Sequence, residues 1–386
     1  MNNSSKTIFT TGATGYLGSY FLYHLLQHTN HVIYCLGRNK GNLTAEERVY
    51  LKLNQIHISY GHEGLNDFDL VNKIKTNLKI VSGDIVKQGL GLKEDLTGKS
   101  ISEFWHIAAN VQFLESKRDE IMQTNVNGGR NVLEFVKQHK IPVLNYVSTA
   151  YVAGTKSGDI GECPADESYP VNNAYEQSKR IIEKEIIESH CTRNLNYRIF
   201  RPAIIVGHSV TLEPDISNGG LYGFMYLCAH VKEQLEKHLP GYLNNNHIKL
   251  KADRNSSLSL IPVDEVVTTM FEMSKHPKSL NRIYHVTPGF NIPLINVAKV
   301  VRKLLGLNIK LVSTNENFTA ADRLFNRQVA MYSSYLFNEK QFMRSYDLVN
   351  LKDCNYPINN KKLYAMVERF FNNLKKINQR EAVVVF

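Results

Sequence analysis

The stretch TTGATGYLGSY, residues 10–20, follows the short apolar run KTIFT and precedes a helical pattern. A turn between a buried strand and a helix is tight, and it leaves the first helical N–H groups without backbone partners. We predict that Gly12 allows the sharp turn, that Gly15 leaves space for a phosphate, and that Gly18 lets the helix approach the strand. Because the helix dipole and the free N–H groups favour a pyrophosphate, this stretch predicts a dinucleotide site.

Strand-length apolar runs alternate with helical patterns from residue 6 to about residue 206. This alternation predicts an α/β fold, a Rossmann-like doubly wound parallel sheet with helices on both faces. After Gly207 the pattern changes, which predicts a smaller mixed α/β carboxyl-terminal lobe, with helical stretches near 321–346 and 359–376. We expect a cofactor-binding Rossmann domain over residues 1–206 and a substrate-binding lobe over residues 207–386, with segments near 258–290 returning to the first domain.

Composition excludes several classes of protein. With 386 residues, 43% of them hydrophobic and 21% charged, the chain is in the ordinary globular range. Its formal net charge of +10 is dispersed, and no nucleic-acid motif accompanies it, so we expect no nucleic-acid partner. No apolar run or leader pattern predicts a membrane span or export, so we expect a cytoplasmic protein. The five cysteines are scattered without metal-ligand spacing, so we expect no metal site.

Arg38 lies twenty residues after Gly18, at the end of the run HVIYCLGR. An acidic residue at this point would accept hydrogen bonds from the adenosine ribose, whereas an arginine can hold a 2′-phosphate. Arg38 therefore favours NADP(H), with Lys40 or Arg48 able to share the contact. A solvated surface arginine is the alternative interpretation.

The segment YEQSK places Tyr175 and Lys179 four residues apart at the start of a predicted helix, on one face. A fixed ammonium beside a phenol stabilises the phenolate, which makes the tyrosine a usable proton donor near neutral pH. Lys179 can also hold the nicotinamide ribose. On its own this spacing also arises by chance and in surface-helix pairs.

The opening TGATGYLG resembles the extended short-chain dehydrogenase/reductase superfamily, and the resemblance continues for about 200 residues. It implies a catalytic hydroxyl at Thr149, five residues before Gly154 in VSTAYVAG and twenty-six before Tyr175, with Ser148 as the substitute. This hydroxyl can hydrogen-bond the substrate carbonyl as hydride arrives. The predicted catalytic set is therefore Thr149, Tyr175 and Lys179.

The resemblance also implies that Asp84 and Ile85, in SGDI, flank the adenine, and that Ala108 and Ala109 line the cofactor. The predicted cofactor-binding residues are Thr11, Gly12, Gly15, Tyr16, Leu17, Gly18, Arg38, Arg48, Asp84, Ile85, Ala108, Ala109, Tyr175 and Lys179.

Four other polar or aromatic residues receive structural interpretations. We expect a packed or backbone-bonded histidine at His106 and a bridge between helix and strand backbones at Asn125. We expect a helix cap at Asp264 and a core position for Trp105.

Several further stretches resemble one branch of the superfamily, which contains thioester reductase domains, carboxylic acid reductase termini and fatty acyl-CoA reductases. They are CLGRNK, GDIVKQGLGLKEDL, FWHIAANVQF, STAYVAG and RPAIIVGHS. The branch implies NADPH-dependent reduction of an acyl thioester. Thr149 and Tyr175 would stabilise and protonate the oxygen, the hemithioacetal would release a thiol and an aldehyde, and a second hydride could give an alcohol. The chain departs from the branch after GHS, where the expected glycines come late, at 219 and 220.

The substrate implied is an acyl thioester on coenzyme A or on an acyl or peptidyl carrier protein, and the net positive charge would suit an acidic carrier. Two alternatives stay open. The first is a nucleotide-sugar epimerase, dehydratase or reductase that uses the same three residues. The second is a non-catalytic NADP-binding regulator, against which an intact Thr, Tyr and Lys set argues.

Overall fold

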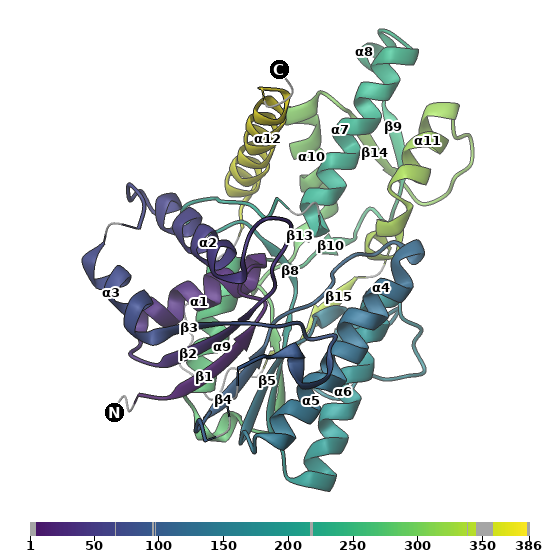
Figure 1. Ribbon diagram of the computed structural model, residues 1–386. Coiled ribbons are helices and arrows are strands. Elements are labelled where there is room, and N and C mark those ends of the chain that lie inside the picture. The colour runs from purple at the N-terminus through teal and green to yellow at the C-terminus, as the bar shows by residue number, and fades with distance from the viewer. Residues whose placement is uncertain are drawn as a thin grey trace.

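A computed structural model describes residues 5–65, 67–94, 96, 98–216, 219–337, 339–344 and 358–383. Its centre is a sheet of seven strands in the order β3-β2-β1-β4-β5-β7-β12, in which all neighbours pair in parallel (Figure 1). This arrangement confirms the predicted doubly wound sheet. The strands are β1 Thr7–Thr11, β2 Val32–Gly37, β3 Leu78–Ser82, β4 Glu103–His106, β5 Val143–Val147, β7 Asn196–Pro202 and β12 Arg282–Val286.

Helices cover both faces of this sheet (Figure 1). One face packs against α1 Tyr16–His28, α2 Ala45–Ser59, α3 Phe68–Asn77 and α9 Val263–Ser274, and the other against α5 Gly128–Gln138 and α6 Ala174–Arg193. Successive side chains of β1 reach opposite faces. Ile8 packs in the core on the α1 side, whereas Phe9 stacks on Phe104 with ring centroids 5.0 Å apart, beside Phe135 of α5. Apolar residues on both faces are what a parallel sheet covered by helices requires.

The carboxyl-terminal lobe has a hydrophobic core of its own, to which α7, α10 and α12 contribute Phe224, Val301 and Phe370. Its elements are α7 Gly220–His238, α8 Tyr242–Asn245, β9 Ile248–Lys251, β10 Ser257–Leu258, β13 Ile292–Pro293, α10 Leu294–Leu305, β14 Ile309–Val312, α11 Ala320–Gln328 and α12 Asn360–Val383. Between them, β11 Leu260–Pro262 pairs with β8 Ile204–Val206, and β12 joins the main sheet. The division of the chain at residue 206 stays a prediction.

One stretch of the lobe returns to the sheet half, and we call residues 330–337 and 339–344 the crossing segment. It contains the 3-10 helix η6, Ala330–Leu336, and the strand β15, Lys340–Phe342, which pairs in parallel with β6, Gly158–Ile160. The predicted helical stretch near 321–346 is therefore wrong at β15, while residues 338, 345 and 346 lie outside the described residues. Backbone pairing with β6 replaces helical hydrogen bonds there, an example of tertiary contacts overriding local propensity.

The helix-cap interpretation of Asp264 is also wrong. The residue before α9 is Pro262, which has no side-chain donor or acceptor, and Asp264 lies inside the first turn. Its carboxylate accepts hydrogen bonds from the backbone N–H of Ser209, at 2.8 Å, and from the Ser209 hydroxyl. Asp264 therefore holds the loop that follows β8.

Candidate active site

The turn between β1 and α1 needs its glycines. Gly12 has a φ of +85°, and a Cβ atom there would lie 2.7 Å from the backbone nitrogen of Ala108. A Cβ atom on Gly18 would lie 2.2 Å from the carbonyl oxygen of Gly12, so the helix can start this close to the strand only with glycine. No side chain caps α1, which begins at Tyr16 after Gly15. This cradle fits a phosphate group at a helix N-terminus.

Thr11 joins the carboxyl ends of β1 and β4. Its hydroxyl oxygen accepts hydrogen bonds from the N–H groups of Ile107, at 3.2 Å, and Ala108, at 3.3 Å, and contacts Nδ1 of His106 at 2.9 Å. Burial lowers the pKa of His106 to about 3, so the imidazole is neutral. His106 thus has a packing and hydrogen-bonding role, as predicted. The hydrogen bonds of Thr11 also fix the backbone of Ala108, which lines the cavity.

Arg38 and Arg48 lie together beside the glycine turn. Arg48 donates hydrogen bonds to the carbonyl oxygen of Arg38 and, at 3.4 Å, to the hydroxyl of Thr14. Arg38 reaches Asp84 at 3.4 Å, and its side chain is mostly exposed. Two guanidinium groups at the end of β2 form a cationic site that could hold a 2′-phosphate.

The three predicted catalytic residues come together at the end of β5. Thr149 lies two residues after that strand, and Tyr175 and Lys179 lie in the first two turns of α6. The hydroxyl of Thr149 accepts a 3.2 Å hydrogen bond from the Tyr151 N–H and interacts with the Tyr175 hydroxyl. Nζ of Lys179 donates a 2.7 Å hydrogen bond to the carbonyl oxygen of Val147.

Burial sets the proton affinities of this group. Burial raises the pKa of Tyr175 well above its ordinary value, the Glu176 carboxylate raises it further, and the Thr149 hydroxyl opposes the shift. Burial lowers the pKa of Lys179 to about 7, against the effect of the Glu183 carboxylate. The site therefore offers a protonated phenol beside an amine that titrates near neutral pH.

A cavity of about 1010 Å³ joins the glycine turn, the Thr149 group and the lobe. This volume is at the upper limit of a single ligand site, so it suits a cofactor together with a substrate. Of the predicted site residues, those that line the cavity are Thr11, Gly12, Gly15, Tyr16, Leu17, Gly18, Arg38, Ile85, Ala108, Ala109, Thr149, Tyr175 and Lys179. Arg48 and Asp84 do not line the cavity but contact Arg38, which does.

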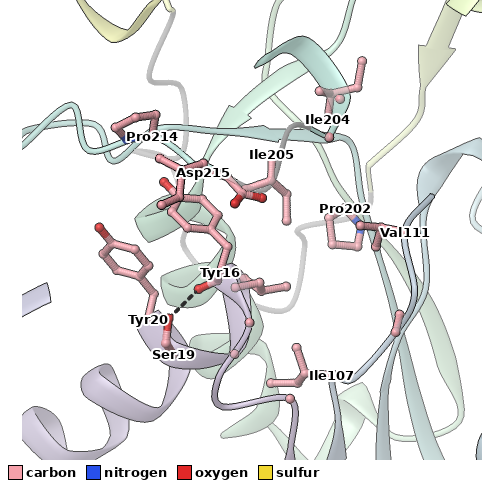
Figure 2. Close-up of a pocket in the computed structure, with 18 of the residues that line it drawn as sticks. Tyr16, Ser19, Tyr20, Ile107, Val111, Pro202, Ile204, Ile205, Pro214 and Asp215 are labelled. Atoms are coloured by element: carbon pink, nitrogen blue, oxygen red, sulfur yellow. Dashed lines mark hydrogen bonds between the residues drawn. The ribbon is translucent and has the colours of Figure 1, made fainter. Parts of the chain in front are cut away.

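Figure 2 shows how α1 contributes to this cavity, with the side chains of Tyr16 and Tyr20 rising toward Pro214. The Tyr16 hydroxyl donates a 2.7 Å hydrogen bond to the carbonyl oxygen of Glu213. The Glu213 carboxylate in turn accepts hydrogen bonds from Arg369, at 2.7 Å, and from Asn373, both on α12. The loop after β8 is therefore held between α1 and α12.

The lobe supplies cavity residues that sequence reasoning missed. The apolar ones include Leu221, Phe224, Leu258, Leu294, Val297 and Leu336. Arg369 and Lys376 of the lobe are solvent-exposed and add cationic groups, as does Lys52 of α2. These residues come from separated elements without a local motif, so only the fold brings them to one cavity.

Asn125 lies in a π-helical turn, Gln123–Asn127, and bridges three groups. Its Oδ1 accepts a 2.7 Å hydrogen bond from the Asn110 N–H, and its Nδ2 donates to the Asn110 carbonyl and to the Ser178 hydroxyl. The structural role predicted for Asn125 is confirmed, but its partners are the backbone of the loop after β4 and a side-chain hydroxyl of α6 rather than helix and strand backbones. The core position of Trp105 is confirmed, since it is buried between Phe21 and Phe200. Asn125 thus connects α6 to the chain that follows β4.

Within the described ranges, no helix has the length and apolarity to cross a bilayer. Nor does that part of the chain gather three His, Cys, Asp or Glu side chains into a group that could hold a metal ion.

Comparisons with known proteins agree with this geometry. The NAD_binding_4 family model, described as male sterility protein, matches residues 10–270. The nonribosomal peptide synthetase asaC of Aspergillus flavus is 27% identical over 300 residues, which cover 74% of this chain and 26% of that protein. A probable fatty acyl-CoA reductase 5 of Arabidopsis thaliana is 32% identical over 168 residues, covering 42% of this chain and 34% of that protein. The chain thus spans about a quarter to a third of the length of these relatives.

Solved structures share the fold. The terminal R domain of the myxalamid PKS-NRPS biosynthetic pathway superposes with a TM-score of 0.74 at 21% identity, covering 97% of this chain and 92% of that one. A UDP-galactose 4-epimerase superposes with a TM-score of 0.59 at 15% identity, covering 95% and 99%.

Proposed function

The chain belongs to the male sterility protein family. From this premise we propose that it is an NAD(P)-dependent oxidoreductase of the extended short-chain dehydrogenase/reductase type that reduces an acyl thioester with NADPH. The product is an aldehyde, which a second hydride can carry to the alcohol. The proposed catalytic residues are Thr149, Tyr175 and Lys179.

The observation that carries this proposal is the lining of the cavity beyond Tyr175. The lobe contributes an apolar part of the wall there, with Leu221, Phe224, Leu258 and Leu294 among its residues. A buried polar group without a hydrogen-bond partner costs about 1–3 kcal/mol, so such a wall disfavours the hydroxyl groups of a sugar. It suits an acyl group instead.

The residues of the site would act in a fixed order. Bound NADPH would supply the hydride. The hydroxyls of Thr149 and Tyr175 donate hydrogen bonds to the thioester carbonyl oxygen and stabilise its developing negative charge. Tyr175 then gives its proton to this oxygen, and the positive charge of Lys179 stabilises the phenolate that results. Collapse of the hemithioacetal breaks the carbon–sulfur bond and releases thiol and aldehyde.

The preference for NADPH rests on Arg38 and Arg48. Their guanidinium groups lie beside the turn whose glycines would receive the pyrophosphate, where an acidic residue would favour the free ribose of NAD. Burial and the neighbouring Arg38 charge both lower the pKa of Arg48. A phosphate dianion between the two guanidinium groups would relieve their mutual repulsion.

The thioester carrier is either coenzyme A or a carrier protein. Lys52, Arg369 and Lys376 line the cavity and would receive the phosphate of a pantetheine arm. The net charge of +10 would attract an acidic carrier. Relatives described as nonribosomal peptide synthetases, and the shared fold of a thiolation-reductase di-domain, support a carrier-bound substrate.

A spectrophotometric assay tests the proposal. Purified protein is mixed with NADPH and a panel of acyl-CoA and acyl-pantetheine thioesters, and the absorbance of the reduced nicotinamide is followed. We expect oxidation that depends on the thioester and falls by about 10²-fold to 10⁴-fold in Tyr175→Phe. Tyr169→Phe is the matched control, since Tyr169 is exposed and lies outside the cavity. Turnover of nucleotide sugars without thioester reduction would favour the epimerase alternative.

A further inference from the structure

Glu176 is a buried carboxylate beside the catalytic tyrosine, and the mechanism above does not use it. It directly follows Tyr175 in the first turn of α6, and its side chain is fully buried. Isolated buried carboxylates are costly, so a group in this position requires partners. The partners come from both halves of the molecule.

The Glu176 carboxylate accepts hydrogen bonds from Asn172 and Tyr335. Oε2 accepts from the backbone N–H of Asn172 at 2.8 Å and from its side-chain Nδ2 at 3.0 Å. Oε1 accepts from the hydroxyl of Tyr335 at 2.6 Å. A carboxylate surrounded by donors is suited to the ionised form.

Tyr335 belongs to the crossing segment and is held in place from several sides. Its hydroxyl accepts a 2.8 Å hydrogen bond from Nδ2 of Asn173, the residue that caps α6. Its ring stacks on Phe113 with centroids 5.6 Å apart and meets the edge of Tyr151 at 5.1 Å. The crossing segment is therefore attached to the start of α6 by the Tyr335 hydroxyl, which hydrogen-bonds the side chains of Asn173 and Glu176.

The same residues face the cavity. Tyr335 and Tyr175 both line it, and Phe113, which also lines it, lies 6.0 Å from the Tyr175 ring. A substrate that enters the cavity would thus contact the aromatic group that holds Glu176.

We propose that Glu176 and Tyr335 are positioning residues for Tyr175. The crossing segment docks on Glu176 through Tyr335, which fixes the first turn of α6 and holds the Glu176 charge near the Tyr175 phenol. The assignment rests on the proposed role of Tyr175 as proton donor.

The charges around Glu176 are consistent with this role. On α6 it faces Tyr175 and Arg180, on the segment after β5 it faces Tyr151, and on the crossing segment it faces Tyr335 and Lys340. Burial raises the pKa of Glu176 above its ordinary value, and the donors Tyr335 and Asn172 and the positive charge of Lys340 offset only part of this rise. Its negative charge raises the pKa of Tyr175.

The test measures the ionisation of residue 175 directly. A fluorinated tyrosine, whose ordinary pKa is lower than that of tyrosine, is incorporated at position 175 of the full chain, and its titration is followed by ¹⁹F NMR with NADP bound. Glu176→Gln should lower its pKa by about one unit or more, because a nearby negative charge is removed. Glu185→Gln removes the same charge from the same helix, outside the cavity, and should leave the pKa unchanged.

A second variant keeps the test independent of folding defects in Glu176→Gln. Tyr335→Phe removes only the hydroxyl, and we expect kcat for thioester reduction to fall about tenfold while the affinity for NADPH is unchanged. An unshifted ¹⁹F titration in folded Glu176→Gln, or wild-type kcat in Tyr335→Phe, would overturn the proposal. If the wild-type protein reduces no thioester, the proposed function fails, while the titration still decides whether Glu176 controls Tyr175.

Discussion

Lys179 donates a 2.7 Å hydrogen bond to the carbonyl oxygen of Val147, the last residue of β5, and its Nζ lies 4.7 Å from the ring centroid of Tyr146. The amine is therefore held by the end of the sheet and by an aromatic face, which favours its charged form. Burial acts in the opposite direction and lowers its pKa to about 7.

The first prediction concerns pH. The charged form of Lys179 is present below its pKa and is lost as pH rises through about 7. If that charge stabilises the Tyr175 phenolate, the rate of thioester reduction should fall as pH rises from 6 to 9. The measurement is the initial rate of NADPH oxidation at saturating cofactor. Lys179→Met should be slower and should lose this limb of the profile; a limb that persists in the variant would assign it to another group.

The second prediction separates Thr149 from Ser148. Both line the cavity, and the Ser148 hydroxyl is buried with no hydrogen-bond partner among the described residues. Loss of one donor to a developing oxyanion costs about 10²-fold to 10³-fold in kcat, so Thr149→Val should show a loss of this size. Ser148→Ala should stay within about threefold of the wild type, since removing a hydroxyl that makes no hydrogen bond forfeits none. The reverse order in kcat would show that Ser148 is the catalytic hydroxyl.

The third prediction tests cofactor preference. Arg38→Ala should weaken NADPH binding by about 10-fold to 100-fold, because a charge-assisted hydrogen bond contributes about 1.5–3 kcal/mol. NADH, which lacks the 2′-phosphate, should bind as it does to the wild type. Nicotinamide fluorescence on titration measures both. Lys99→Ala, at an exposed position outside the cavity, controls for the loss of one charge. Equal weakening for both cofactors would show that Arg38 contacts a part of the cofactor other than the 2′-phosphate.

The fourth prediction concerns stability. Arg201 and Glu183 form a bidentate ion pair at 2.9 and 2.6 Å, and both side chains are 2% exposed. Glu183→Gln leaves a buried guanidinium uncompensated, which should lower the free energy of unfolding by about 3–5 kcal/mol. Glu185→Gln, which breaks the half-exposed pair with Arg130, should cost at most about 1 kcal/mol. Urea denaturation compares the two; equal losses would contradict the expectation.

The parts of the molecule that sequence predicted are those where chemistry within one short segment decides geometry. At the turn before α1, a φ of +85° at Gly12 and a backbone contact at Gly18 admit only glycine, so the pattern has one structural meaning. The alternation of strands and helices similarly leaves few ways to bury apolar residues on two faces of a sheet.

The remaining features depend on contacts between distant segments. Glu176 and Tyr335 are 159 residues apart, and the sequence around either residue does not predict contact with the other. The helical pattern near residue 340 was misleading because β15 finds a partner strand in β6. Asp264 has the chemistry of a helix cap, yet it lies inside the first turn of α9, and Ser209 provides a partner that only the fold brings near it.

The crossing segment has a consequence for recombination between relatives. This segment belongs to the lobe in chain order, yet its strand β15 completes a small sheet with β6 and its Tyr335 holds the first turn of α6. A lobe transplanted from a relative would bring its own version of this segment to an unmatched α6. Exchange of substrate specificity by grafting should therefore succeed only when Asn173 and Glu176, or their counterparts, are inherited together with the lobe.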